Sequence, residues 1–351
     1  MRPVDAAGKM EPILVALDQI LAARRRIAPY LEPTPLQASR TFSRMTGWQV
    51  WLKPENLQRT GSFKARGALN AVLRLAEGEG ETGGPQAPSR RRGVITASSG
   101  NHGQAVAFAA ASAGLPATVV VPEQASPAKV AAMEGYGARV VRHGRFPDER
   151  KAHARRLARE EGLHYIDSTD DPDVIAGQGT VAVEVLEDLP DVAALVVPVG
   201  GGGLISGVAA AVKGMRPGVR VIGVEPVGSA AMHASLQAGR PVTLDQVDSV
   251  ADGLWCRRPG DLCFAHVRRF VDDIVRVDEA EILAAMALLA ERAKLVVEPS
   301  GAVSLAAGLA RRLPGVAAGR PVAFVLTGGN VALDRYTAWL AEPQRVWSPE
   351  G

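Results

Sequence analysis

The sequence contains very little cysteine. Its 351 residues include 2 cysteines, Cys256 and Cys263. Neither has histidines at metal-ligand spacing, so no zinc site is indicated, and two cysteines do not make the dense disulfide framework of small secreted domains. This composition is typical of a protein in a reducing compartment.

The sequence also lacks long apolar runs and a strong excess of one charge. No uninterrupted apolar stretch is long enough to span a bilayer, and acidic residues interrupt the N-terminal segment, so a signal peptide is not expected. Lysine and arginine number 40 and aspartate and glutamate 37, which leaves a net charge of +3. The arginine runs at residues 24–26 and 90–92 have no interleaved aromatic residues and indicate solvated surface. We therefore expect a cytoplasmic protein with no nucleic-acid or membrane partner.

Short β-branched runs alternate with helical patterns along most of the chain. The runs that predict strands lie at residues 49–52, 94–97, 118–121, 139–141, 195–199, 219–224 and 322–326. This alternation predicts an α/β fold with mainly parallel sheets flanked by helices. A chain of this length is expected to divide into two domains. A stretch rich in Gly, Glu, Thr and Pro at residues 78–88 predicts a surface loop.

Lys64 follows the first predicted strand, within the stretch from Glu55 to Asn70. Small residues precede it and a helical pattern at residues 65–75 follows, so Lys64 is expected near a helix N-terminus. The positive end of the helix dipole disfavours protonation of the amine there, and a neutral lysine is a nucleophile. Taken alone, the stretch favours an ordinary surface lysine. The assignment of Lys64 therefore depends on the rest of the chain.

Two further predicted strands end in turns that suit anions. Residues 98–104 (Ser-Ser-Gly-Asn-His-Gly-Gln) place hydroxyls, an amide and free backbone N–H groups at a helix start, which favours a carboxylate site over a simple capped turn. Residues 200–203 are four consecutive glycines that open another helix, which predicts a phosphate cradle. No Lys-Ser/Thr pair follows the glycines and Glu225 is only loosely placed for a ribose, so a single phosphate is favoured over a nucleotide.

A hydroxyl follows the last predicted strand. Thr327 begins the stretch Thr-Gly-Gly-Asn, and its side chain could hydrogen-bond a neutral ring nitrogen without protonating it. On spacing alone, this stretch could equally be a tight turn.

Taken together, these stretches resemble the fold type II pyridoxal-phosphate enzymes, and most closely the threonine/serine ammonia-lyase (dehydratase) and serine racemase group. The resemblance spans about residues 27–333. Its motifs, in the family's order, are residues 62–68 (Ser-Phe-Lys-Ala-Arg-Gly-Ala), 98–104, 200–203, 251–253 (Ala-Asp-Gly), 298–302 (Glu-Pro-Ser-Gly-Ala) and 327–330. It implies a tryptophan synthase β-like fold, with a large cofactor-binding domain of residues 1–66 and 165–351 and a small substrate-binding domain of residues 67–164 inserted in it.

The resemblance assigns roles to individual residues. Lys64 is implied to carry pyridoxal 5'-phosphate and to act as the base, Asn101 to contact the cofactor's 3-oxygen, and Thr327 to face the ring nitrogen, where the group more often has serine or cysteine. The residues implied to bind the cofactor are Phe63, Lys64, Asn101, Gly200, Gly201, Gly202, Gly203, Leu204, Gly253 and Thr327. The residues implied to bind the substrate, a small amino acid, are Ser98, Ser99, Gly100, Asn101 and His102.

The implied reaction is β-elimination of the hydroxyl from L-threonine or L-serine, which yields 2-oxobutanoate or pyruvate and ammonia. The alternatives are an ammonia-lyase for another 3-hydroxy amino acid such as hydroxyaspartate or phenylserine, a serine or amino-acid racemase, and a protein that binds the cofactor without turnover. Ser99, a catalytic candidate beside Lys64, stands where the racemases have their second base, so its presence does not separate the two activities.

The resemblance also bears on metal binding and assembly. Ala231 stands where an aspartate of the racemases' metal site is expected, which leaves Glu225 as a metal ligand or as a surface residue at a strand end. No further α/β module follows Asn330, so a C-terminal regulatory domain is not expected. Members of the resembled family usually form dimers or tetramers, so the resemblance implies a homodimer or homotetramer.

Overall fold

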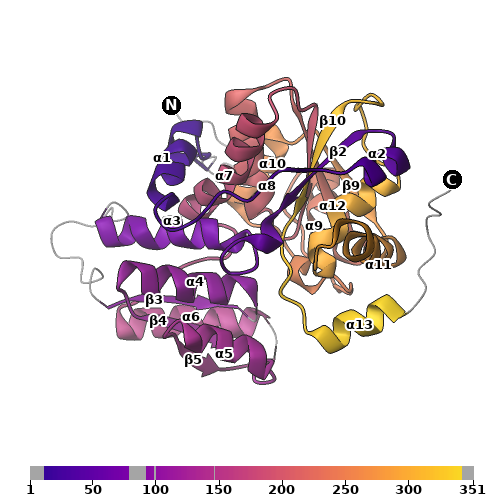
Figure 1. Cartoon of the computed structure of the whole chain (residues 1–351). Coiled ribbons are helices and arrows are strands. Elements are labelled where there is room, and N and C mark those ends of the chain that lie inside the picture. Colours follow the sequence, from indigo (N-terminus) through magenta and orange to yellow (C-terminus); the bar gives the residue numbers. More distant parts are fainter. Residues whose placement is uncertain (1–11, 79–91, 99, 146, 342–351) are drawn as a thin grey trace.

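The structure is a computed structural model that describes residues 12–78, 92–98, 100–145 and 147–341. Its described part contains two separate β-sheets with helices around each (Figure 1). The larger sheet has six strands in the order β1-β2-β10-β7-β8-β9, and the smaller has four in the order β5-β4-β3-β6. The strand pairs are parallel apart from β1 with β2. The predicted α/β fold with mainly parallel sheets is confirmed.

The six-stranded sheet is built from both ends of the chain. Its strands are β1 (Gln37–Ala38), β2 (Gln49–Pro54), β7 (Ala194–Pro198), β8 (Arg220–Pro226), β9 (Asp273–Val277) and β10 (Pro321–Leu326). The α-helices around it are α1 (Leu17–Ile27), α2 (Arg40–Thr46), α7 (Pro172–Asp188), α8 (Gly203–Met215), α9 (Ala231–Ala238), α10 (Asp261–Phe270), α11 (Glu279–Leu288), α12 (Pro299–Leu309) and α13 (Leu333–Ala341). Short helical turns are η1 (Glu55–Leu57), η3 (Val227–Ser229), η4 (Asp252–Leu254) and the π-turn η5 (Leu289–Ala293).

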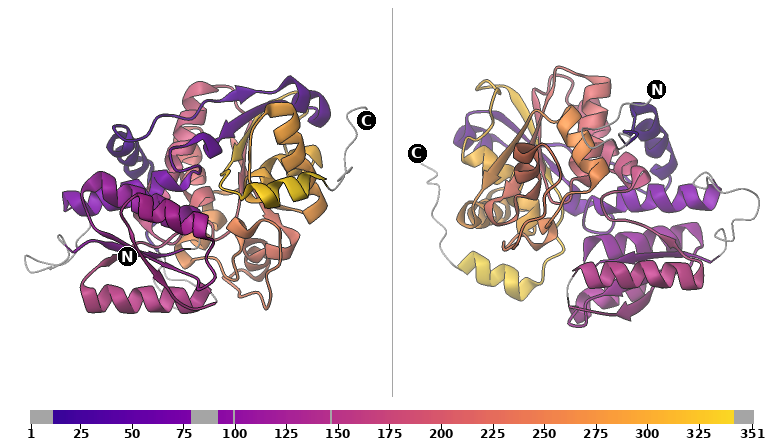
Figure 2. Two further views of the ribbon diagram at one scale, coloured as in Figure 1. Left: turned by 60° about the horizontal axis from the view of Figure 1, so that its bottom comes forward. Right: turned by 180° about the vertical axis from the view of Figure 1, so that it is seen from behind.

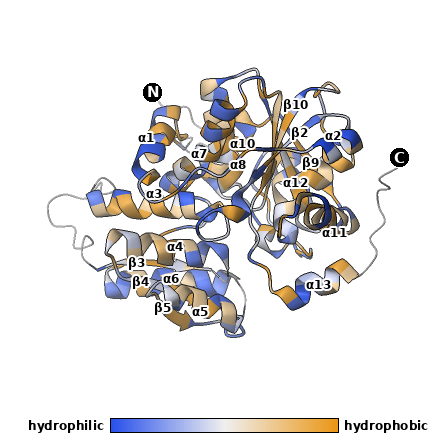
Figure 3. Ribbon diagram, in the orientation of Figure 1, coloured by the Kyte–Doolittle hydropathy of each residue, from blue (hydrophilic) through white to orange (hydrophobic). Residues whose placement is uncertain are grey.

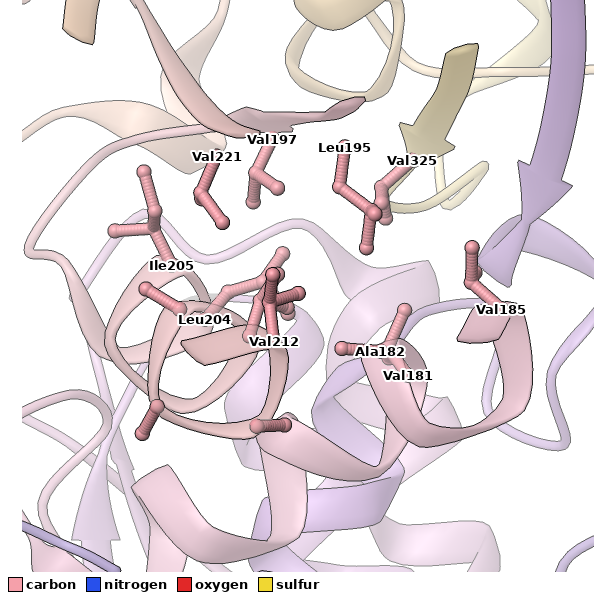
Figure 4. Close-up of a cluster of buried hydrophobic side chains, with 14 of the residues drawn as sticks. Val181, Ala182, Val185, Leu195, Val197, Leu204, Ile205, Val212, Val221 and Val325 are labelled. Carbon is pink, nitrogen blue, oxygen red and sulfur yellow. The ribbon is translucent and has the colours of Figure 1, made fainter. Parts of the chain in front are cut away.

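The central strands are buried on both faces. Strand β7 reads Ala-Leu-Val-Val-Pro and is buried throughout, as expected for a continuous apolar run in a parallel sheet. Leu195 and Val197 pack with side chains of α7 and α8 on one face (Figure 4). Val196 points to the opposite face, in a second cluster that includes α11 and α12. The period-two alternation of a strand therefore builds two cores from one sheet.

The four-stranded sheet lies at the opposite end of the molecule, where the segment from β3 to β6 gathers in all three ribbon views (Figures 1 and 2). Its strands are β3 (Val94–Ala97), β4 (Ala117–Val121), β5 (Arg139–Arg142) and β6 (His164–Tyr165). The helices are α4 (Asn101–Ala113), α5 (Pro127–Gly135) and α6 (Pro147–Glu161), and α3 (Lys64–Glu77) lies between this region and α7. Buried side chains of α3 and α4 share one core with β3 and β4.

The predicted strands are present, each within two residues of its expected bounds. The short strands β1 and β6 and the half-exposed β9 were not predicted. Most of the predicted loop at residues 78–88 lies outside the described residues. Hydrophilic and hydrophobic residues are mixed on the helices that surround the sheets (Figure 3), and within the described ranges no helix has both the length and the apolar character needed to cross a membrane.

Candidate active site

Lys64 is the first residue of α3, as the sequence predicted. Its Nζ donates a hydrogen bond to the carbonyl oxygen of Ser168 at 2.8 Å. Burial lowers the pKa of the amine to about 8, Asp167 acts against this shift, and the positive charge of Lys151 adds to it. The sequence argument relied on the helix dipole, whereas burial is the larger physical cause. A lysine with this pKa is partly neutral near neutral pH.

Thr327 lies beside the start of α3. It directly follows β10, its side chain is buried, and its carbonyl oxygen accepts a hydrogen bond from the backbone N–H of Phe63 at 3.1 Å. An isolated bridge between Ser62 and Gly328 continues this pairing. The Thr327 hydroxyl is 3.3 Å from the carbonyl oxygen of Ser300. Two motifs that are more than two hundred residues apart in the sequence thus form one corner of the site.

The turn of residues 98–102 joins β3 to α4. No side chain caps the start of α4 in the described part of the chain, so its first backbone N–H groups are available for a ligand. The N–H of Gly100 donates to Oγ of Ser98 at 3.2 Å. Ser99 lies outside the described residues, so its predicted role stays a prediction. The turn has the features of a carboxylate site.

His102 is the second residue of α4, and its side chain is buried. Its Nε2 is 3.4 Å from the carbonyl oxygen of Ile166, a contact that ties the turn to the end of β6. Burial, together with the charge of Lys64, lowers the pKa of His102 to about 3. A neutral imidazole therefore faces the site near neutral pH.

Asn101 belongs to a chain of side-chain hydrogen bonds. Its Nδ2 donates to Oε1 of Glu298 at 2.7 Å, and its Oδ1 accepts from Nδ2 of Asn330 at 2.8 Å. Burial, together with the charge of Asp252, raises the pKa of Glu298 to about 7. These contacts fix the plane of the Asn101 amide.

The glycine loop follows β7 and opens α8. A Cβ on Gly201 would lie 2.8 Å from Cγ2 of Thr169, and one on Gly203 would lie 3.0 Å from Cα of Thr169. Gly202 has a φ of +100°, which favours glycine. Among the described residues, no side chain caps the start of α8. The loop therefore approaches its neighbours too closely for side chains and presents backbone N–H groups, as a phosphate cradle requires.

Gly253 is held against α12. Its N–H donates to Oγ of Ser300 at 2.9 Å, and a Cβ added to Gly253 would lie 2.8 Å from the same oxygen. A side chain at this position would thus displace Ser300, whose carbonyl oxygen contacts Thr327. Ser300 therefore contacts both Gly253 and Thr327.

Sequence reasoning missed the loop after β6. Asp167 accepts backbone N–H bonds from Thr169 and Asp170, and this places Ser168 against Lys64 and Thr169 against the glycines. The sequence has a polar run here, Asp-Ser-Thr-Asp at residues 167–170, which could have marked a functional loop. The strand before this run has only two residues, however, and so shows no periodicity that would predict a strand. Glu298 was seen as part of a motif and was given no role.

Glu225 was predicted as either a metal ligand or a surface residue, and the surface reading is wrong. Its side chain is fully buried and accepts the backbone N–H groups of Met232 and His233 at 2.9 and 2.8 Å. Burial raises the pKa of its carboxyl to about 8. Within the described ranges, no three His, Cys, Asp or Glu side chains are grouped so that they could hold a metal ion.

The described residues fit pyridoxal phosphate. The Lys64 amine is buried, the cradle at residues 200–203 consists of glycines, and no side chain of the described ranges caps the start of α4 or α8. In addition, Oγ of Ser62 and Nδ1 of His102 are buried and have no hydrogen-bond partner in the part of the chain that the structure describes. Buried polar groups of this kind require a partner, and a polar cofactor with a bound substrate supplies one.

Comparisons with known proteins agree with this geometry. A family model described as pyridoxal-phosphate dependent enzyme matches residues 27–328. The chain is 44% identical over 318 residues to an L-threonine ammonia-lyase of Thermotoga maritima, covering 91% of this chain and 76% of the relative. It is 41% identical to an L-threo-3-hydroxyaspartate ammonia-lyase of Saccharomyces cerevisiae, covering 94% of this chain and 97% of that protein.

A solved structure shares the architecture. The structure of maize serine racemase superposes with a TM-score of 0.86 at 37% identity, covering 93% of this chain and 96% of that one. Together with the family match over residues 27–328, this likeness shows that the chain belongs to the pyridoxal-phosphate dependent enzymes of fold type II and that its cofactor is pyridoxal 5'-phosphate.

Proposed function

We propose that the protein is an ammonia-lyase for L-3-hydroxy amino acids, with L-threonine and L-serine as its first candidate substrates. The products would be 2-oxobutanoate or pyruvate, with ammonia. The observation that carries the proposal is the buried Lys64 amine, with its pKa of about 8, together with the uncapped carboxylate turn at α4. The names of the two ammonia-lyase relatives support the same reaction class.

The cofactor would be held by residues of both sheets. Backbone N–H groups of residues 200–204 would bind its phosphate, the Asn101 amide its 3-oxygen and the Thr327 hydroxyl its ring nitrogen, while Phe63 and Gly253 would flank the ring. Lys64 would carry it. Bound there, pyridoxal phosphate supplies an electron sink for the negative charge that develops at the substrate Cα.

Lys64 is the proposed base. A neutral amine accepts the proton from the substrate Cα, and its pKa of about 8 leaves part of the population neutral at physiological pH. The Thr327 hydroxyl carries no charge, so it does not stabilise a proton on the ring nitrogen as a carboxylate would. This favours elimination, because departure of the 3-hydroxyl removes the negative charge as it develops.

The substrate carboxylate would lie on the turn of residues 98–102. Because the pKa of His102 is about 3, this turn would bind the carboxylate through N–H and hydroxyl groups instead of an imidazolium charge. In the proposal, Ser98, Ser99, Gly100, Asn101 and His102 together orient the substrate. Ser99 keeps its predicted place as the second catalytic candidate.

Serine racemase is the second candidate, favoured by the superposition on the maize enzyme. A panel of L- and D-forms of serine, threonine and phenylserine, scored for ammonia and 2-oxo acid, separates the two. We expect L-threonine and L-serine to release both products. Chirality of the serine recovered from the same reaction tests the alternative: conversion to D-serine without ammonia would replace the lyase by a racemase.

Two features of the molecule also stand as proposals. The division into residues 67–164 and the remaining chain agrees with the two separate sheets, although β6 at residues 164–165 crosses that boundary. By analogy with the family, we propose a homodimer or homotetramer. Size-exclusion chromatography of the holoenzyme with light-scattering detection would distinguish these assemblies from a monomer.

A further inference from the structure

A surface pocket lies at the carboxyl edge of the six-stranded sheet, where the parallel strands β8 and β9 end. It has a volume of about 430 Å³, and its described lining residues include none of those assigned to the cofactor or the substrate. The segment that follows β8, helix α9, residues 244–248 and Arg276 near the end of β9 contribute to its lining. Ligands of parallel sheets bind at this edge, and a pocket of this size can hold a small metabolite.

One wall of the pocket, residues 244–248, is held at both ends by hydrogen bonds. The N–H of Asp248 donates to the carbonyl oxygen of Gly228 at 3.0 Å, and the N–H of Leu244 donates to that of Arg257 at 2.7 Å. Nε of Arg257 in turn donates to the carbonyl oxygen of Leu244 at 3.1 Å. A Cβ on Gly228 would collide with the carbonyl oxygen of Asp248, so this wall lies directly on the backbone of η3. The pocket is therefore a preformed part of the fold.

Helix α9 forms another wall, and a buried carboxyl holds its start. Glu225 accepts the backbone N–H groups of Met232 and His233, and His233 and Gln237 of this helix line the pocket. Burial raises the pKa of Glu225 to about 8, although its backbone hydrogen bonds and the charge of Arg276 act against this shift. Near neutral pH this carboxyl is therefore mostly protonated and does not neutralise Arg276.

Two opposite charges line the pocket and are paired with nothing else. The Arg276 guanidinium and the Asp248 carboxylate make no hydrogen bond or ion pair through their side chains, with each other or with any other residue that the structure describes. Arg312 donates to the carbonyl oxygen of Arg276 at 2.9 Å, but its charge is paired with Glu281 at 2.6 Å. The pocket thus presents one cation and one anion, each with free hydrogen-bonding capacity.

The rest of the lining combines amides with apolar side chains. Gln237 and Gln246 supply donors and acceptors, while Val227, which is 56% exposed, and the half-buried Leu244 supply apolar surface. A ligand that carries both a carboxylate and an ammonium group satisfies both charges of the pocket at once, whereas a simple anion or cation leaves one of them unpaired. An α-amino acid carries both groups on one carbon atom.

We propose that this pocket binds a zwitterionic α-amino acid with a compact apolar side chain, with Arg276 on its carboxylate and Asp248 on its ammonium group. This site is additional to the substrate position at the turn of residues 98–102. The inference goes beyond the proposed function and does not rest on it, because binding here involves no reaction at the cofactor.

Binding is tested on the holoenzyme with L-proline, cyclopentanecarboxylate and pyrrolidine. The three are similar in size, L-proline alone carries both charges, and none has a primary amine that could replace Lys64 on the cofactor. Calorimetry should show L-proline binding about 10-fold more tightly than either of the others, the scale of one charge-assisted hydrogen bond. Arg276→Met should lower the L-proline affinity to that of pyrrolidine, and Asp248→Asn should lower it to that of cyclopentanecarboxylate.

Arg240→Met and Asp245→Asn are the matched controls. Arg240 follows α9 and Asp245 belongs to the wall of residues 244–248, and both are exposed but do not line the pocket. Each control removes the same charge as its lining counterpart and should leave the L-proline affinity unchanged. If the controls lost as much affinity as Arg276→Met and Asp248→Asn, the effect would come from surface charge in general and the inference would fail.

Hydrogen exchange then locates the bound ligand. L-Proline should slow exchange in peptides that cover residues 227–237 and 244–248 and leave the turn of residues 98–102 unchanged. Slower exchange at that turn instead of at the pocket would place L-proline in the candidate active site and overturn the inference. Equal binding of the three ligands to the wild type, or an L-proline affinity that survives intact in Arg276→Met or in Asp248→Asn, would also overturn it.

Discussion

At the scale of single residues, burial sets the protonation of the site's most important groups. It lowers the pKa of Lys64 and His102 and raises that of Glu298. Each shift favours the uncharged form, as desolvation requires. The site thus offers a base that is partly neutral, a neutral imidazole and a carboxyl that titrates near neutrality.

Replacing Lys64 tests its assignment directly. Borohydride reduction of the wild-type holoenzyme should fix pyridoxal phosphate to Lys64, as identified by peptide mass spectrometry. Lys64→Ala should show no such label and should lose at least about 100-fold in kcat, the lower end of what a positioned base contributes. Lys129→Met should keep the label at Lys64. A label on another lysine of the wild type would contradict the assignment.

The raised pKa of Glu298 predicts that the stability of the protein depends on pH. Burial raises its pKa in the folded protein to about 7 from 4.5, so the folded state binds the proton more tightly than the unfolded state. The stability from this group is fully present below about pH 4.5 and is lost as the pH rises to about 7. Glu298→Gln keeps an acceptor for Asn101 and removes this loss, so the variant should be relatively more stable at pH 8, by about 3 kcal/mol at most.

The measurement is the difference in Tm between wild type and Glu298→Gln from pH 4.5 to 8. Glu225, with its own raised pKa of about 8, is present in both proteins and cancels in the difference. A difference that stays constant over this range would show that Glu298 does not titrate there.

At the scale of elements, the sequence predicted what periodicity and composition can encode. The strand at residues 94–97 and the helix that begins at Lys64 were predicted because apolar runs and small residues mark them. The loop of residues 166–171 was not predicted, because its position depends on β6 pairing with β3 across the small sheet. The role of Glu298 was missed for a similar reason: its contact with Asn101 joins residues 197 positions apart.

The glycine loop makes a prediction at this scale. A Cβ on Gly203 would meet the backbone of Thr169, with both Cα and the carbonyl oxygen at 3.0 Å, and backbone atoms cannot rotate away. Gly203→Ala should therefore displace the loop and weaken pyridoxal phosphate binding by about 10-fold or more, in line with overpacking costs of 1–3 kcal/mol. Titration of the apo-protein, followed by absorbance, measures this.

Gly218→Ala is the matched comparison. Gly203 opens α8, whereas Gly218 follows the end of that helix, and a Cβ at Gly218 would have no atom within 4 Å. The cofactor affinity of Gly218→Ala should therefore equal that of the wild type. Equal affinity of Gly203→Ala and Gly218→Ala would remove the support for a cradle formed by close approach.

At the scale of the whole molecule, α3 connects the two sheets. The helix shares a core with α4 of the small sheet and also packs on α7 (Figure 1). Arg66, two residues after Lys64, is almost fully buried and bonds both Glu55 and Glu184. Lys53 of β2 donates to Glu184 at 2.7 Å, so two buried cations face two buried carboxylates. Burial alone would raise the pKa of Glu184, but Arg66 and Lys53 lower it to about 2.

Removing the Arg66 cation from this buried network should lower the stability of the fold. Arg66→Met would leave Glu55 and part of Glu184 without their cation in a site that excludes water, and breaking a buried ion pair from one side costs about 3–5 kcal/mol. Arg74→Met is the comparison on the same helix, because Arg74 pairs with Asp173 at a half-exposed position and such pairs contribute at most about 1 kcal/mol. Urea unfolding of both variants should place the midpoint of Arg66→Met well below that of Arg74→Met. Equal midpoints would mean that the network does not hold α3, and with it Lys64, between the two sheets.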